Sequence, residues 1–105
     1  MNMIERTRPR TGLRVLVTAG ASGIGASIAS AFLEAGAKVL ICDVDERALE
    51  SFATQYPDVL TLVTDVSDEA QVDQLLDAAA VKLGGLDVLV NNAGISGPTG
   101  PIDEL

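Results

Sequence analysis

The stretch Thr18-Ala19-Gly20-Ala21-Ser22-Gly23-Ile24-Gly25 decides how this chain folds, because it joins two segments with different hydrophobic periods. The residues that lead into it, Leu13–Thr18, form the short aliphatic run that a buried strand requires. After it, apolar residues recur at helical spacing as far as Gly36, a natural helix stop. The stretch is therefore predicted to be a tight turn from a strand into a helix. The apolar residues predicted to face the core from this helix are Ile24, Ile28, Ala31, Phe32 and Ala35.

Three more strand-like runs follow, at Lys38–Cys42, Val59–Thr64 and Leu86–Val90, and amphipathic segments separate them. Asp45 is predicted to cap the second helix, which ends before Pro57. Its apolar stripe is Leu49, Phe52, Ala53 and Tyr56.

The third helix is predicted to begin with Ser67 as its cap and with Asp68 and Glu69 in its positive first turn. It stops at Gly84-Gly85. Its apolar stripe is Val72, Leu75, Leu76, Ala79 and Leu83.

The order βαβαβαβ predicts an α/β fold, a partial doubly wound parallel sheet of the Rossmann type with strand order 3-2-1-4. Residues 12–105 are expected to form this one unit, and residues 1–11 a tail. The arginine-rich start could instead belong to a transit peptide, but Glu5 and Pro9 argue against that interpretation.

The composition excludes several classes of protein. With 48% hydrophobic residues among 105, the chain is not disordered, and its net charge of −8 would repel a nucleic-acid backbone. Cys42 is the only cysteine and there is no histidine, which excludes an intrachain disulfide and argues against a metal site. No apolar run approaches the roughly 20 residues that span a membrane. We therefore expect a cytoplasmic protein, with Cys42 as a small buried hydrophobe.

The predicted topology brings Thr18–Gly25 and Asn91–Gly94 together, because ligands of such sheets bind where the strand order reverses. Backbone amides at a helix start attract anions, and glycines let a pyrophosphate approach them. Tight strand–helix turns use glycine anyway, so the turn alone is weak evidence. Asp43 adds to it, because it follows Gly25 at nearly the spacing expected of an acid that binds an adenosine ribose.

A nucleoside triphosphatase loop is the competing interpretation. Gly20-x-x-x-x-Gly25-Ala26-Ser27 matches that pattern except at Ala26, where a lysine must reach the β- and γ-phosphates. The missing lysine argues against this alternative.

With these residues identified, the chain resembles the N-terminal part of the short-chain dehydrogenases/reductases, from about Leu13 to its last residue. Four motifs carry the resemblance, each at the end of its strand: Thr18–Gly25, Asp43, Asp65-Val66 and Asn91-Asn92-Ala93-Gly94. The family implies an oxidoreductase that moves hydride between NAD and an alcohol or carbonyl substrate. The residues implied to hold the cofactor pyrophosphate are Gly20, Ser22, Gly23, Ile24 and Gly25.

The resemblance also implies roles for the other motifs. Asp43 would bind the adenosine ribose hydroxyls and select NAD, and the pair Asp65-Val66 would contact adenine. Asn92 would tie neighbouring strands together through its side chain. The residues implied to line the cofactor as it crosses the sheet are Asn91, Ala93 and Gly94.

The chain departs from the family in two ways. It has Ala19 where the family has the first glycine of the turn, and the family's catalytic serine, tyrosine and lysine would lie downstream of Gly94. The only tyrosine, Tyr56, has Leu60 four residues later and is predicted to be a core residue. No catalytic residue is therefore assigned.

Two functional classes stay open: a fragment of an NAD-dependent dehydrogenase, or a non-catalytic nucleotide-binding or interaction module. The apolar fourth strand, Leu86–Val90, is an edge in the predicted order, and Val88 or its neighbours would face water. We therefore expect self-association through this edge or a complex with the missing C-terminal half.

Overall fold

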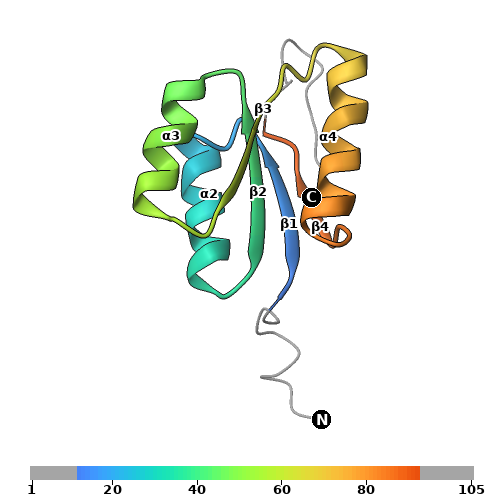
Figure 1. The fold of residues 1–105 in the computed structure, drawn as a ribbon. Coiled ribbons are helices and arrows are strands. Elements are labelled where there is room, and N and C mark those ends of the chain that lie inside the picture. Colours follow the sequence, from blue (N-terminus) through green and yellow to red (C-terminus); the bar gives the residue numbers. More distant parts are fainter. Residues whose placement is uncertain (1–11, 93–105) are drawn as a thin grey trace.

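The computed structural model describes residues 12–92, in which strands and helices alternate (Figure 1). The four strands are parallel, in the order β3-β2-β1-β4, which confirms the predicted topology. Each strand begins and ends within two residues of its predicted bounds. The elements are β1 (Arg14–Thr18), α2 (Gly23–Glu34), β2 (Lys38–Asp43), α3 (Glu46–Gln55), β3 (Leu60–Val63), α4 (Glu69–Lys82) and β4 (Val88–Val90).

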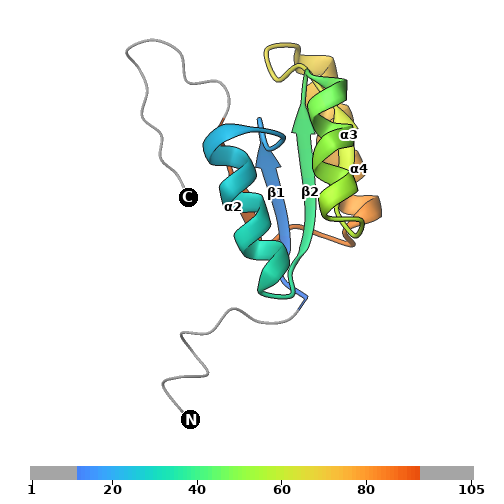
Figure 2. The same ribbon diagram turned by 90° about the vertical axis from the view of Figure 1, so that its left-hand side faces the viewer.

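Helices cover both faces of the sheet, with α2 and α3 on one side and α4 on the other (Figures 1 and 2). The alternation of β1 divides the core accordingly. Val15 and Val17 belong to the cluster beneath α2 and α3, whereas Leu16 packs with Cys42 and Leu75 beneath α4. Cys42 is completely buried, as predicted, and burial raises the pKa of its thiol to about 11.

The predicted core face of α2 is wrong by part of a turn. Ile24 is 71% exposed, and Ala31 and Ala35 are also exposed. The buried residues of the helix are Gly25 and Ala29. The periodicity did not identify the buried face, because this helix has apolar side chains on several sides. Close packing brings its smallest residues nearest to the sheet. Leu76 of α4 is likewise 46% exposed, against prediction.

The cap of α4 is also corrected. Asp68, not Ser67, is the N-cap, and its Oδ1 accepts hydrogen bonds from Ala70 N at 2.9 Å and Gln71 N at 3.4 Å. A carboxylate is the stronger acceptor at the positive end of a helix. Asp45 caps α3 as predicted and accepts from Ala48 N at 3.1 Å.

A contact that the sequence did not predict fixes the start of β4 beside β1. The Arg14 side chain donates to both carboxylate oxygens of Asp87 and to the Gly84 carbonyl, all within 2.9 Å. In return, Asp87 N donates to the Arg14 carbonyl at 2.8 Å. A β-carbon on Gly85 would lie 2.5 Å from the guanidinium of Arg14. The glycine pair thus makes room for the clamp as well as ending the helix.

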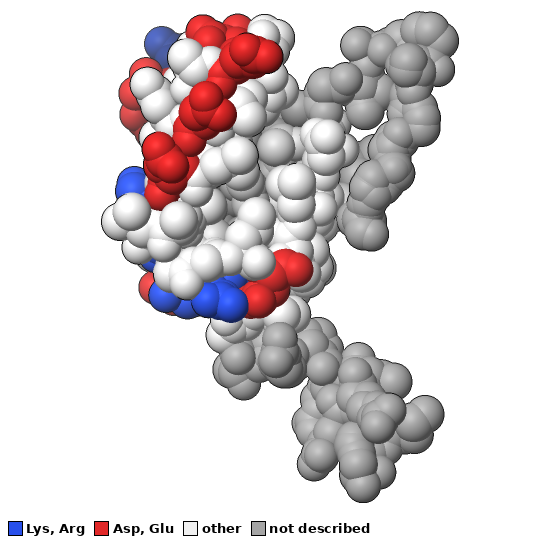
Figure 3. All heavy atoms as spheres, turned by 90° about the vertical axis from the view of Figure 1, so that its right-hand side faces the viewer, with Lys and Arg blue, Asp and Glu red and all other residues white. Residues whose placement is uncertain are grey.

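The outer side of α4 is acidic. Figure 3, which views this side of the molecule, shows a diagonal line of acidic side chains, and the sequence of α4 has exposed carboxylates at every fourth position, Glu69, Asp73 and Asp77. Such a face repels a phosphate backbone, in keeping with the net charge.

The corrected cap can be tested by substitution. Asp68→Ala is expected to lower the free energy of unfolding by about 1 kcal/mol, because it leaves the Ala70 and Gln71 amides without their acceptor. Ser67→Ala is the matched control and should have a smaller effect. Urea denaturation followed by circular dichroism measures both, and a larger loss for Ser67→Ala would restore Ser67 as the cap.

Candidate functional site

The ends of β1 and β4 meet where the strand order reverses, as predicted. Val17 pairs with Val90, and the residues that follow the two strands contact each other. Asn92 N donates to Thr18 Oγ1 at 2.8 Å, and the Asn92 side-chain amide donates to the Ala19 carbonyl at 3.4 Å. Asn92 therefore ties the end of β4 to the glycine turn. The predicted residues Ala93 and Gly94 lie outside the described residues.

Glycine occupies each of its three positions in the turn for a different physical reason. A β-carbon on Gly25 would overlap the Ala19 carbonyl oxygen, so only glycine lets α2 approach the turn this closely. A β-carbon on Gly20 would lie 2.8 Å from the Ile41 side chain, and Gly20 N already donates to the Cys42 carbonyl at 3.1 Å. Gly23 has φ +61°, a conformation that favours glycine, and a β-carbon there would meet only open space.

The start of α2 carries no acidic group of its own. Its N-cap, Ser22, is exposed and makes no capping hydrogen bond, and the first turn has no acidic residue. In contrast, α3 and α4 each have an aspartate cap and a glutamate in the first turn. Exposed Gly23 and Ile24 complete the first turn of α2. This helix start therefore keeps the partial positive charge that would attract an anion.

Asp43 faces the glycine turn from the end of β2. Its Oδ2 accepts a hydrogen bond from Ala21 N at 3.3 Å, and its Oδ1 accepts one from Asp45 N at 3.1 Å. The half-buried carboxylate is thus held beside the start of α2, while Asp45 caps α3. This arrangement places a fixed acceptor next to an uncompensated helix start.

Asp65 and Val66 follow β3 on the far side of the site. Ser67 donates to Asp65 Oδ1 through its amide at 2.9 Å and its hydroxyl at 2.6 Å, and these hydrogen bonds lower the pKa of the Asp65 carboxyl. Val66 and Asn91 line a cavity of about 300 Å³ beneath α4. The other residues around this cavity are mostly apolar, and Leu75 and Leu89 are among them.

Sequence reasoning missed Gln71, whose side chain accepts a hydrogen bond from Asp65 N at 2.8 Å. The only available signal was its place in the first turn of the third helix, five residues after Val66. It also missed the hydroxyl of Thr18, which lies 3.2 Å from Asn91 Oδ1. Threonine is common in strands, so nothing in the sequence distinguished Thr18 from an ordinary strand residue.

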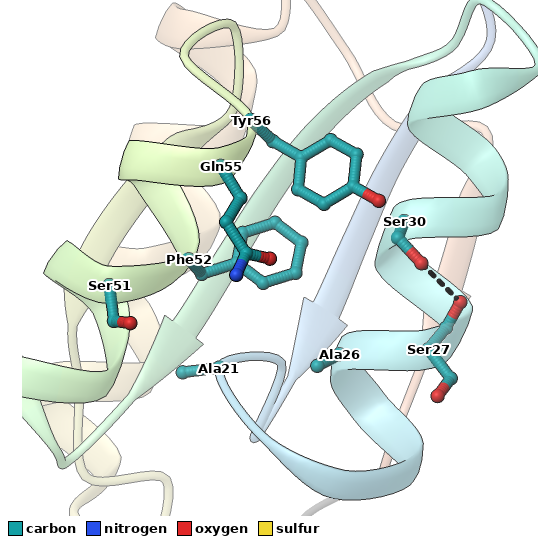
Figure 4. A pocket seen from close by; sticks show the side chains of 8 residues that line it. All are labelled: Ala21, Ala26, Ser27, Ser30, Ser51, Phe52, Gln55 and Tyr56. Carbon is teal, nitrogen blue, oxygen red and sulfur yellow. Dashed lines mark hydrogen bonds between the residues drawn. The ribbon is translucent and has the colours of Figure 1, made fainter.

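Tyr56 is a packing residue, as predicted. Its ring stacks on Phe52 with centroids 5.0 Å apart, and its hydroxyl donates to Glu34 at 3.0 Å. It lines a groove of about 280 Å³ between α2 and α3. Figure 4 shows Ser27 and Ser30 on the α2 side of this groove, where the Ser30 hydroxyl donates to the Ser27 backbone carbonyl at 3.0 Å. This groove brings no acid or base together with a nucleophile.

Residues 12–92 contain no cluster of three or more histidine, cysteine or acidic side chains that could hold a metal ion. Over the same residues, no helix is both long and apolar enough to cross a membrane.

Comparison with known proteins identifies many similar chains. A family model described as short chain dehydrogenase matches residues 14–105. Cis-4-hydroxycyclohexanecarboxylate dehydrogenase of Sinomonas cyclohexanicum is 48% identical in an alignment 94 residues long, which covers 86% of this chain and 37% of the relative. The 3beta-hydroxysteroid dehydrogenase 2 of Eggerthella lenta is 43% identical over 98 residues, 90% of this chain and 38% of that protein. The chain thus spans less than two fifths of these relatives.

Solved structures agree in fold. A 3-ketoacyl-(acyl-carrier-protein) reductase from Brucella melitensis complexed with NADH matches with a TM-score of 0.76 and 42% identity, over 81% of this chain and 35% of that one. A short chain dehydrogenase from Burkholderia cenocepacia in complex with NADP matches with a TM-score of 0.75 and 36% identity, over 81% and 37%.

The turn contains a strained position that substitution can relax. Ala19 has φ +51°, a left-handed conformation that costs a residue with a β-carbon about 1–2 kcal/mol. Ala19→Gly is expected to raise the free energy of unfolding by up to about 1 kcal/mol, because the added chain entropy of glycine offsets only about 0.5–1 kcal/mol. Ala21→Gly, at a buried position, is the control and should destabilise. Equal destabilisation by both in urea denaturation would contradict the prediction.

Proposed function

The chain belongs to the short-chain dehydrogenase family, and from that premise we propose that it is the dinucleotide-binding part of an oxidoreductase. One observation carries the proposal: the start of α2 has no capping side chain and no acid, and Asp43 stands beside it. A pyrophosphate fits that helix start, at the open backbone of Gly23, and a ribose fits the carboxylate. Ser22, Ile24 and Gly25 would donate their backbone amides to the pyrophosphate. Gly20 would hold the turn in place through its hydrogen bond to the Cys42 carbonyl.

The nicotinamide cofactor would supply the hydride chemistry when bound. The chain's own described residues would bind and orient it, with Asp65-Val66 at the adenine and Asn91 where the cofactor crosses the sheet. Asn92 would hold the end of β4 against the glycine turn. The serine, tyrosine and lysine that the family uses for proton transfer would lie outside residues 12–92. We assign no catalytic residue to residues 12–92. Dehydrogenase activity is proposed only for a protein that also contains those three residues.

NAD rather than NADP is the proposed cofactor, although similar structures hold either one. Asp43 is fixed by two backbone amides and therefore cannot easily turn away from a 2′-phosphate. At about 4 Å the repulsion is roughly 4 kcal/mol per unit charge at an effective dielectric near 20, and less when screened. A ribose hydroxyl would instead donate to the same carboxylate.

Calorimetric titration with both cofactors tests this assignment. The unaltered chain should bind NAD at least tenfold more tightly, and Asp43→Asn should reduce the ratio to roughly threefold or less. Asp45→Asn is the matched control, because asparagine still caps α3 and the ratio should not change. Preference for NADP, or an unchanged ratio in Asp43→Asn, would remove the ribose role from Asp43.

The second candidate function, an interaction module, is favoured by the β4 edge. β4 pairs only with β1 in the described sheet, and near it Leu76, Leu86 and Leu89 are 46%, 38% and 43% exposed. Val88, the residue singled out from the sequence, is half-buried on the α2 side, so its neighbour Leu89 is the exposed one. The proposed partner is a second copy or the remainder of a longer protein. A cytoplasmic location stays a prediction from the sequence.

Light scattering on the purified chain tests self-association through this edge. The unaltered chain should form a dimer or larger species at high micromolar concentration, and Leu89→Lys should make it monomeric because a charge cannot enter an apolar interface cheaply. Val81→Lys is the control, since Val81 is 80% exposed on α4 without lining the cavity. A monomer in all three samples would contradict self-association through this edge.

A further inference from the structure

The loop between β3 and α4 holds Asp65 in a network that the family motifs do not describe. Asp65 Oδ1 accepts both hydrogen bonds from Ser67. Among the described residues, no hydrogen bond reaches Asp65 Oδ2. One oxygen of the carboxylate is therefore committed to the loop, and the other is available to a ligand.

Gln71 connects this loop to the first turn of α4. Its Oε1 accepts from Asp65 N at 2.8 Å, and its Nε2 donates to Asp68 Oδ2 at 3.2 Å. Each end of the side-chain amide thus faces the partner that its chemistry requires, which fixes the orientation of the half-buried group. Asp68 in turn is held by the helix amides that it caps.

We propose that Gln71 is a positioning residue for the base-binding end of the site, where it holds the Asp65 backbone so that the free carboxylate oxygen accepts from an amino group on the base. The inference rests on the proposed function, because it needs a dinucleotide to bind. Val66 and Asn91, which line the neighbouring cavity, would flank the base. Adenine carries an amino donor where hypoxanthine carries a carbonyl acceptor. Gln71 would therefore contribute to discrimination between these two bases.

The test compares NAD with nicotinamide hypoxanthine dinucleotide, titrated into the 105-residue chain and followed by NMR. The unaltered chain should prefer NAD, and Gln71→Met should reduce that preference about three- to tenfold by weakening NAD binding alone. Gln74→Met is the matched control, because Gln74 is exposed on the same helix. It should leave the preference unchanged.

A second variant separates positioning from folding. Gln71→Glu keeps an acceptor for Asp65 N, so it should retain more of the preference for NAD than Gln71→Met. It also places a second carboxylate beside Asp68, so part of the preference should still be lost. Amide exchange at Asp65, measured without ligand, should be faster in Gln71→Met and protected in Gln71→Glu.

The outcomes are distinct. Equal weakening of both dinucleotides, or the same result for Gln71→Met and Gln74→Met, would overturn the inference while the proposed function stands. Should Gln71→Met not fold, Gln71→Glu with an unprotected Asp65 amide would overturn it as well. Failure of the unaltered chain to bind either dinucleotide would overturn the proposed function and this inference with it.

Discussion

The contact of Gly25 with the Ala19 carbonyl is the constraint on which the site depends. Because no β-carbon stands between them, α2 begins against the turn that ends β1. The same carbonyl accepts from Asn92, so the helix, the turn and the end of β4 are held at one point. A larger residue at position 25 would separate all three, and the helix start could no longer face a ligand.

Carboxylates are distributed unevenly around this point, and the distribution separates those that cap helices from those proposed to meet a ligand. Asp45 and Asp68 compensate the starts of α3 and α4, whereas the start of α2 has no such group. Asp43 and Asp65 instead hold loop amides with part of their acceptor capacity. In a chain with a net charge of −8, a helix start with no acid at its own N-cap or first turn is a local exception that favours an anionic ligand.

Large apolar side chains are exposed at several places around this core. Ile24 at the start of α2 and Leu89 on β4 are among them. β4 is apolar throughout, whereas α2 also contains serines and Glu34. Exposed apolar surface is typical of a face that takes part in a contact, which is the basis of the proposal made for the β4 edge.

Local pattern sufficed for the element order, the strand order and the neighbourhood of the glycine turn and Asn92, because strand alternation and right-handed crossovers leave few other arrangements. The sequence also identified Asp45 as a cap and Cys42 as buried. It did not identify the buried face of α2, since apolar side chains lie on several sides of that helix. It also misplaced the cap of α4, because Ser67 and Asp68 are adjacent and both side chains can accept from helix amides. The Arg14–Asp87 clamp and the bond from Asp65 to Gln71 were decided by the tertiary structure alone. Such contacts depend on how neighbouring backbones pack in space, and residue spacing along the chain does not encode that.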